Sequence, residues 1–220
     1  MLYICATPIG NLEDVSLRLI STLKKADLIC AEDTRRVSKL LMRYEIKDKR
    51  IMTYNDRNKE KKTPFIINLL KQDKEVALVS DSGTPCISDP GFYLVREAGK
   101  HNIPVSPIPG PSAAIAALSV SGLATDIFTF YGFLSKKQSK RNDTVEQIKK
   151  RNETSVFYES QYKIEKTMSF FAEHFPGHPC VVCRELTKKF EEIFRGTVTE
   201  VKEKVKKKAK GEFVIIIGKK

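Results

Sequence analysis

The sequence predicts an α/β protein built from two domains, and three observations lead to this fold class. Short apolar runs alternate with segments of helical periodicity from the first residue onward. The runs in the first half are almost continuously apolar, as in a parallel sheet covered on both faces. The segment PIPGPSAAIAALSVSG, residues 107–122, then interrupts the pattern, which restarts after Gly122. We therefore expect an N-terminal domain over 1–122 and a C-terminal domain over 123–220.

In the first domain, strands are expected at the apolar runs 2–6, 28–31, 50–54, 75–80 and 103–108. Helices are expected where apolar residues recur at helical spacing, over 15–23, 34–44, 63–70 and 91–100. Asp33 or Thr34 can cap the second of these helices. Pro111 and Ser112 suit the start of the Ala-rich helix that follows the fifth strand.

In the second domain the same criteria predict five more strands, at 127–131, 154–159, 179–185, 191–197 and 213–218. The helices are expected over 136–152, 163–174 and 198–208. The first and last of these helices are rich in Lys and Arg.

Composition restricts the class of protein. An apolar fraction of 41% and a charged fraction of 30% are typical of a soluble globular protein. No apolar run approaches the length of a membrane span, and the N-terminus lacks the features of a signal peptide. The five cysteines are an odd number, and four lie in or beside apolar runs, which favours a reducing cytoplasm. Cys180 and Cys183 have metal spacing but no second pair, so we expect buried thiols and no metal.

The chain is strongly basic, with 39 Lys and Arg against 27 Asp and Glu and a net charge of +12. Two segments concentrate the excess: 136–151 has seven basic and two acidic residues, and 202–220 has eight and two. Basic clusters of this kind favour a polyanionic partner such as nucleic acid. Solvated faces of Lys-rich helices would give the same pattern, so charge alone leaves both readings open.

Polar loops follow four strands of the first half: TPIGNLED, AEDTRR, SDSGTPCISDPG and PIPGPSA. Ligands of open parallel sheets bind off the carboxyl ends of the strands, where such loops converge. We therefore expect the four loops to form one cleft. The glycine patterns of dinucleotide and P-loop sites are absent, as are metal-spaced Cys and His and the G-x-S-x-G elbow. Spacing alone does not identify the ligand.

The ordered set ATPIGNLEDVSLR, AEDTRR, SDSGTPCISDPG, PIPGPSAAIAALSVSGL, FYGFLSKK and KGEFVIIIGK resembles the tetrapyrrole methylase family. The resemblance runs from Thr7 to Gly218, and is strongest to the bacterial members that methylate a cytidine 2′-hydroxyl of 16S ribosomal RNA in the decoding region. It implies a mainly parallel N-terminal sheet, a mixed C-terminal sheet, and S-adenosylmethionine held between the domains. It also implies a cytoplasmic homodimer acting on 16S ribosomal RNA or the small ribosomal subunit.

By this resemblance, the cofactor contacts fall on the first-strand turn, the G-x-P loop, the start of the Ala-rich helix and three positions of the second domain. They are Pro8, Ile9, Asp81, Gly83, Thr84, Ile87, Ser112, Ala113, Tyr158, Leu186 and Phe213. Asp81 could hydrogen-bond the cofactor or orient Thr84, and closing an Asx-turn is an equal alternative. For the prolines of these loops, simple turning of the chain is an alternative.

Transfer of a methyl group to a hydroxyl benefits from a nearby carboxylate or cation. The acidic candidates are Glu32, Asp33, Asp14 and Asp89, and Arg35 could hold the target phosphate. We select Glu32, Asp33 and Arg35 as catalytic candidates. Capping of the following helix is the alternative for the two carboxylates.

For RNA binding we expect phosphate contacts from the basic residues Arg36, Lys136, Lys137, Lys140 and Arg141. Tyr131 or Phe133 could stack on a base, although core packing is favoured for Phe133. The chain departs from the family pattern at Ser135, where proline is common, and ends where relatives usually continue. Two other functions remain open: methylation of a small molecule or protein side chain, and RNA binding without catalysis.

Overall fold

The computed structural model describes residues 1–208 and 210–220 and divides into two compact units, Met1–Ser112 and Ala113–Lys220. The division falls ten residues before the boundary that we expected at residue 122. The difference is the Ala-rich helix α5 (Ala113–Ser121), which packs on the second sheet and not on the first. Its small side chains Ala114 and Ala117 lie against Val156 and Ile216 of that sheet.

The N-terminal unit contains a five-stranded parallel sheet with strand order β3-β2-β4-β1-β5. The strands are β1 (Leu2–Cys5), β2 (Leu28–Ala31), β3 (Ile51–Thr53), β4 (Val76–Val79) and β5 (Val105–Ile108). A short 3₁₀ helix, Leu12–Asp14, follows β1 and was not expected. The helices are α1 (Leu17–Lys25), α2 (Thr34–Arg43), α3 (Lys59–Lys71) and α4 (Phe92–Lys100).

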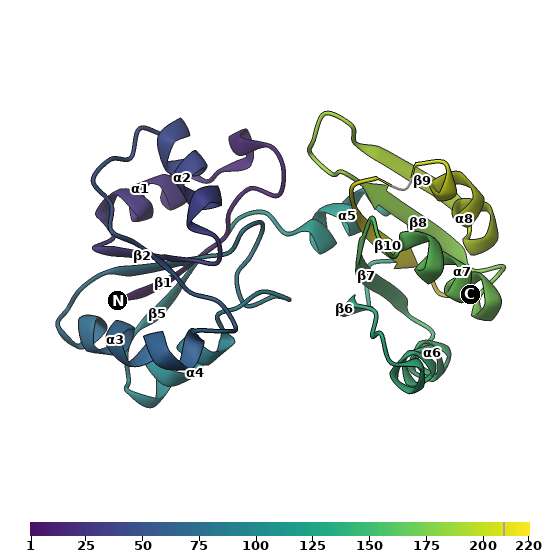
Figure 1. Ribbon diagram of the computed structural model, residues 1–220. Coiled ribbons are helices and arrows are strands. Elements are labelled where there is room, and N and C mark those ends of the chain that lie inside the picture. The colour runs from purple at the N-terminus through teal and green to yellow at the C-terminus, as the bar shows by residue number, and fades with distance from the viewer. Residues whose placement is uncertain (209) are drawn as a thin grey trace. The chain divides into compact units, whose positions relative to one another are not determined.

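Two helices cover each face of this sheet. Leu19 of α1 and Leu40 of α2 pack on one face, and Ile66 of α3 and Leu94 of α4 pack on the other (Figure 1). All four residues of β2 and of β4 are buried, because both faces of these central strands are covered. The predicted parallel sheet is therefore confirmed.

The C-terminal unit contains a mixed sheet with strand order β6-β7-β10-β8-β9. Strands β6 (Phe128–Phe133) and β7 (Thr154–Ser160) are parallel, and the other pairs are antiparallel. The remaining strands are β8 (Pro179–Arg184), β9 (Glu192–Thr197) and β10 (Glu212–Ile217). Helix α5 packs on one face; α6 (Gln138–Arg151), α7 (Ile164–His174) and α8 (Val198–Lys206) cover the other (Figure 1). The expected mixed sheet is confirmed.

Local signals explain several element boundaries. Asp33 caps α2 by accepting a hydrogen bond from the Arg35 N–H. Thr197 and Glu200 form a capping box at the start of α8. Helix α3 begins at Lys59, four residues before the start that we expected.

Four of the five cysteines are buried core residues. Cys5, Cys30, Cys180 and Cys183 are buried, and burial raises the pKa of Cys5 and Cys30 to about 12 and that of Cys183 to about 11. Over 1–208 and 210–220 no three His, Cys, Asp or Glu side chains are grouped as metal ligands would be. Over the same ranges, no helix has the length and apolar character needed to cross a bilayer.

Candidate active site

The four polar loops of the N-terminal unit leave the sheet side by side. They follow β2, β4, β1 and β5, which are consecutive neighbours in the strand order. Because these strands are parallel, their carboxyl ends meet at one edge of the sheet. The expected convergence of the loops at that edge is therefore present in the fold.

Gly83 is the point where three of these loops meet. Its N–H donates to the Thr7 carbonyl at 3.0 Å, and the Thr7 N–H donates to the Gly83 carbonyl at 2.8 Å. The φ angle of Gly83 is +80°, a conformation that favours glycine. A Cβ placed here would lie 3.4 Å from Cγ2 of Ile9 and 3.6 Å from the carbonyl oxygen of Pro111. The loop after β4 is thus held against the loops after β1 and β5.

Thr84 adds a second link between the same loops. Its hydroxyl donates to the Pro111 carbonyl at 3.0 Å, so it is oriented by Pro111 and not by Asp81. Ser112, the next residue, ends the N-terminal unit. The predicted positions Gly83, Thr84 and Ser112 therefore belong to one cluster of loops.

Asp81 links the loop after β4 to the start of α2. Its carboxylate accepts the Asp33 N–H at 2.9 Å and lies 3.3 Å from Nε of Arg36. Its side chain is 26% exposed, so water screens these interactions only partly. We had expected Asp81 to bind the cofactor, orient Thr84 or close an Asx-turn; the structure gives it this cross-loop contact. Arg36, predicted to bind RNA, is engaged by the same carboxylate.

Asp33 and Arg35 form an ion pair with each other. The Asp33 carboxylate accepts from the Arg35 main-chain N–H at 2.9 Å and from Nη2 of Arg35 at 2.6 Å. These hydrogen bonds lower the pKa of Asp33 to about 2. The Arg35 side chain is 86% exposed. The capping alternative for Asp33 is confirmed, and such a weakly basic carboxylate is a poor proton acceptor.

Two other carboxylates at this edge have the opposite character. Burial, followed by the charge of Asp81, raises the pKa of Glu32. Burial, followed by the charge of Glu32, raises the pKa of Asp89 to about 6. Carboxylates with raised pKa values are characteristic of proton-transfer sites. The sequence placed Asp89 among four acidic candidates but contained no signal for its burial.

The chemistry of the N-terminal loops fits a cofactor with an adenine, a diol and a carboxylate. Pro8 and Ile9, in the loop after β1, are buried and provide apolar cover. Ile87, in the loop after β4, is 46% exposed. Within the described part of the chain, the main-chain N–H groups of Ile9 and Thr84 donate no hydrogen bond to another residue. Such groups suit the adenine edge and the carboxylate. These residues would bind and orient the cofactor.

In the C-terminal unit, three predicted cofactor residues lie on one face of the sheet. Ala113, Tyr158 and Leu186 pack against the same hydrophobic cluster, beside α5. The Ala114 N–H donates to the Tyr158 hydroxyl at 3.2 Å, which holds the first turn of α5.

Phe213 lies apart from this group. Its side chain is 2% exposed and belongs to the cluster under α6, α7 and α8, on the opposite face. Successive strand residues point to opposite faces, so Val214 and not Phe213 faces α5. The side chain of Phe213 is therefore a core residue, and the expected contact of Phe213 with the cofactor stays a prediction that would have to use its main chain.

The predicted RNA contacts of the C-terminal unit differ in their surroundings. Lys136, Lys137 and Lys140 are exposed at or near the start of α6. The Arg141 guanidinium instead lies 3.9 Å from the ring centroid of Phe170, and its Nε is buried. This cation–π contact engages Arg141 in the fold.

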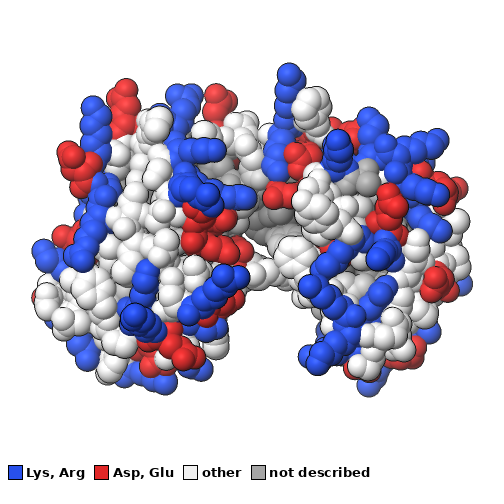
Figure 2. Space-filling view, viewed as in Figure 1, with Lys and Arg blue, Asp and Glu red and all other residues white. Residues whose placement is uncertain are grey.

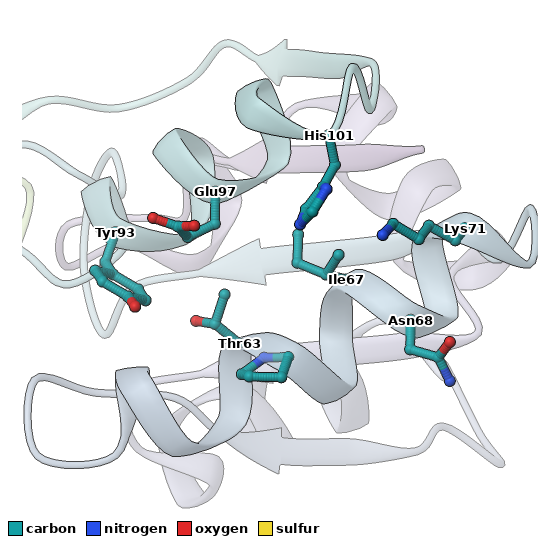
Figure 3. Close-up of a pocket in the computed structure, with 8 residues that line it drawn as sticks. Thr63, Ile67, Asn68, Lys71, Tyr93, Glu97 and His101 are labelled. Carbon is teal, nitrogen blue, oxygen red and sulfur yellow. The ribbon is translucent and has the colours of Figure 1, made fainter.

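A pocket of 280 Å³ lies between α3 and α4. Figure 3 shows Thr63, Ile67 and Lys71 on one side and Tyr93, Glu97 and His101 on the other. None of the residues predicted for the active site lines it. The loops at the carboxyl edge of the sheet remain the candidate site.

The sequence is similar to a known protein family and to named ribosomal RNA methyltransferases. The family model described as Tetrapyrrole (Corrin/Porphyrin) Methylases matches residues 1–202. The chain is 46% identical to Ribosomal RNA small subunit methyltransferase I of Bacillus subtilis, over 91% of this chain and 68% of that protein. It is 43% identical to the protein of the same name from Thermotoga maritima, over 99% and 97%.

The fold is also similar to solved structures of low sequence identity. Diphthine synthase superposes with a TM-score of 0.77 at 14% identity, covering 99% of this chain and 89% of that one. Uroporphyrin-III-C-methyltransferase from Thermus thermophilus superposes with a TM-score of 0.67 at 16% identity, covering 99% and 93%. These structures show the fold. The family match over residues 1–202 and the identity of 43–46% to the named methyltransferases show that the chain belongs to the tetrapyrrole methylase family, and that it is a methyltransferase whose methyl donor is S-adenosylmethionine.

Proposed function

We propose that the chain methylates the 2′-hydroxyl of a cytidine ribose in 16S ribosomal RNA, in the decoding region of the small subunit. The observation that carries the proposal is the near full-length identity of 41–46% to proteins named as small-subunit ribosomal RNA methyltransferases. The net charge of +12 and the exposed lysines at the start of α6 support a polyanionic substrate. Figure 2 shows Lys and Arg over much of the visible face of the C-terminal unit.

S-adenosylmethionine supplies a methyl group on a positively charged sulfur, which is a strong electrophile. The protein's tasks are then to orient the ribose hydroxyl and to accept its proton. Holding two reactants in line contributes up to about 7–11 kcal/mol to lowering the barrier. In our proposal the fixed loops around Gly83 supply this positioning.

We assign Asp89 as the base that accepts the proton of the ribose hydroxyl, with Glu32 as its neighbour. A carboxylate with a pKa near 6 is largely ionised at neutral pH and is a stronger base than an ordinary aspartate. Asp33 is unsuitable because its hydrogen bonds to Arg35 hold its pKa near 2. Asp81 serves as a positioning residue, because it fixes the start of α2 next to Glu32. Base catalysis of this kind is worth about 10²–10⁴-fold in rate.

The reaction is tested by mapping ribose methylation in small-subunit RNA with reverse transcription at limiting nucleotide concentration. We expect one new stop that depends on both the protein and S-adenosylmethionine. Assembled subunits and naked 16S RNA should be compared as substrates in the same assay. Transfer of labelled methyl to a base, a protein or a small molecule would overturn the proposal.

We further propose that the enzyme is a cytoplasmic homodimer. The names of the relatives give ribosomal RNA as their substrate, and ribosomal RNA is cytoplasmic in bacteria, which supports the cytoplasmic location. Size-exclusion chromatography with light scattering tests the assembly, since the mass of one chain is 25.0 kDa. A mass of about 25 kDa at micromolar concentration would contradict the dimer.

A further inference from the structure

One end of the second sheet gathers segments that are far apart in the sequence. Phe133 of β6 is level with Tyr158 of β7, Ser160 pairs with Glu212 of β10, and Phe213 pairs with Arg184 of β8. The loops 134–137, 161–163 and 185–191 therefore all leave from this end, as does the turn that leads into β10. We call this region the loop end of the second sheet.

Three large aromatic side chains are exposed at the loop end. The exposed fractions are 55% for Phe133, 83% for Tyr162 and 65% for Phe190. They come from or just after three different strands: Phe133 ends β6, Tyr162 follows β7, and Phe190 follows β8. Exposed rings grouped in this way indicate an interaction surface more often than isolated apolar residues do.

The loops that carry these rings are also rich in lysine. Lys136, Lys137, Lys163, Lys189 and Lys210 occupy the same loops. Among residues 1–208 and 210–220, no carboxylate oxygen lies within 4 Å of the ammonium group of any of these five. Other cations at the loop end are neutralised: Arg184 pairs with Glu192 at 2.7 Å, and Lys188 pairs with Glu212 at 2.6 Å. Lys189 lies 5.7 Å from the centroid of the Phe190 ring. A set of cations without carboxylate partners beside exposed rings favours an anionic partner that can stack.

A hollow of 350 Å³ adjoins Phe133 on the face covered by α6. Leu134 and Phe157 give it an apolar wall, and Lys140, Asp143 and Gln147 supply donors and acceptors. An aromatic wall with polar groups at its rim is suited to an unstacked base, which is read along its hydrogen-bonding edge.

We propose that the loop end of the second sheet binds single-stranded RNA, with bases stacked on Phe133, Tyr162 and Phe190 and phosphates held by the five lysines. This inference rests on the proposed RNA substrate and names the surface that grips it. Adjacent strands lie about 4.8 Å apart, so the span from β6 to β8, three spacings, is about 14 Å. That span matches a few nucleotides of extended single strand. Base–aromatic stacking with a basic surround is how proteins hold single strands with little sequence preference.

The experiment measures binding of a fluorescein-labelled 12-nucleotide oligouridine to the full chain by fluorescence anisotropy, at several salt concentrations. Tyr162→Ala and Phe190→Ala are the main variants, because both side chains are mostly exposed and their removal spares the core. Phe128→Ala is the matched control: this ring is 38% exposed at the opposite end of β6. Lys163→Ala and Lys189→Ala test the phosphate contacts, with Lys219→Ala beyond the opposite end of the sheet as their control.

We expect each aromatic variant to bind about 5- to 100-fold more weakly, and the Phe128→Ala control to bind as the wild type does. Each lysine variant should reduce the slope of log affinity against log salt by about 0.7. If Tyr162→Ala and Phe190→Ala bind the RNA as tightly as the Phe128→Ala control does, the proposal is overturned. The proposal is also overturned if the aromatic substitutions weaken binding of a 12-base-pair duplex RNA as much as that of the single strand, because paired bases cannot stack on the rings.

The outcome is separable from that of the proposed function. Methylation of ribosomal RNA by the wild type tests the reaction, and the variants test the surface. If the wild type methylates RNA and the aromatic variants bind and methylate normally, the surface is wrong and the reaction stands. If the variants lose binding to assembled subunits but not to RNA, the partner of the loop end is a ribosomal protein and the inference fails.

Discussion

Replacement of Asp89 by asparagine is expected to make the protein more stable at neutral pH while slowing methyl transfer. The Asp89 carboxylate is partly buried next to Glu32 and Asp81, and these surroundings raise its pKa from 3.8 to about 6. An acid whose pKa is raised by folding binds protons more tightly in the folded chain. The free energy of unfolding therefore falls as the pH rises from about 4 to about 6.

The size of the effect follows from the same two values. A change from 3.8 to about 6 corresponds to about 3 kcal/mol for a carboxylate shielded from water. Asp89 is only half-buried, so solvent screening reduces the expected cost above pH 6 to about 1–2 kcal/mol. Asparagine has a similar shape and no charge, so Asp89→Asn removes this cost. Loss of the proton acceptor should lower the rate of methyl transfer by about 10²–10⁴-fold.

The measurement is urea unfolding at pH 4 and pH 8, followed by circular dichroism, for the wild type and Asp89→Asn. We expect the variant to gain stability at pH 8 and little at pH 4. Asp27→Asn is a control of opposite sign. Its carboxylate accepts the Glu75 N–H at 2.8 Å, and this bond lowers its pKa, so the variant should lose stability at pH 8.

Two results would refute the reasoning. Equal or lower stability of Asp89→Asn at pH 8 would mean that the carboxylate is not held in a costly position. A normal transfer rate with an unchanged pH–rate profile would mean that Asp89 does not accept the proton. Stabilisation with a normal rate would leave Glu32 as the candidate base.

Four further predictions follow from the site and its supporting core. Gly83→Ala should cost about 1–2 kcal/mol of unfolding free energy in urea titrations, because its φ of +80° strains any side chain; unchanged stability would mean that the turn adapts. Thr84→Arg should abolish S-adenosylmethionine binding in calorimetry while far-ultraviolet circular dichroism stays unchanged; normal affinity would show that the site is misplaced. Phe213→Ala should destabilise the chain by about 3–5 kcal/mol in urea, since the ring is 2% exposed in the core, and a cost below 1 kcal/mol would contradict its placement. Weakened and salt-dependent RNA binding, measured by anisotropy, is expected when glutamate replaces the exposed cations Lys136, Lys137 and Lys140; a loss independent of salt would indicate misfolding instead.

The sequence predicted where the loops of the site lie, but not the contacts that individual side chains make there. The loops after β1, β2, β4 and β5 were expected to converge because ligand-binding loops of a parallel sheet share one edge. The role of Asp81 was not accessible in this way. Its bond to the Asp33 N–H joins residues 48 positions apart, and spacing along the chain contains no information on such a contact.

The sequence by itself determined the order of strands and helices, because continuous apolar runs and helical periodicity are local properties of the chain. It also indicated that the strands of the first sheet are covered on both faces, since a strand such as Val76–Val79 is apolar throughout, which is typical of parallel sheets. Strand β10 is as apolar from Phe213 onward but pairs antiparallel with both neighbours, so such runs show burial and do not fix strand direction. The family followed from loop motifs, which are likewise local.

Only the tertiary structure decided which surface each element packs on. Helix α5 is apolar on all sides, so its periodicity could not show that it belongs to the second sheet. Strand alternation could not show which face of β10 carries Phe213. The raised pKa of Asp89 and the grouping of Tyr162 with Phe190 depend on neighbours from distant segments. Burial, desolvation and strand order are properties of the packed chain, and no single segment contains them.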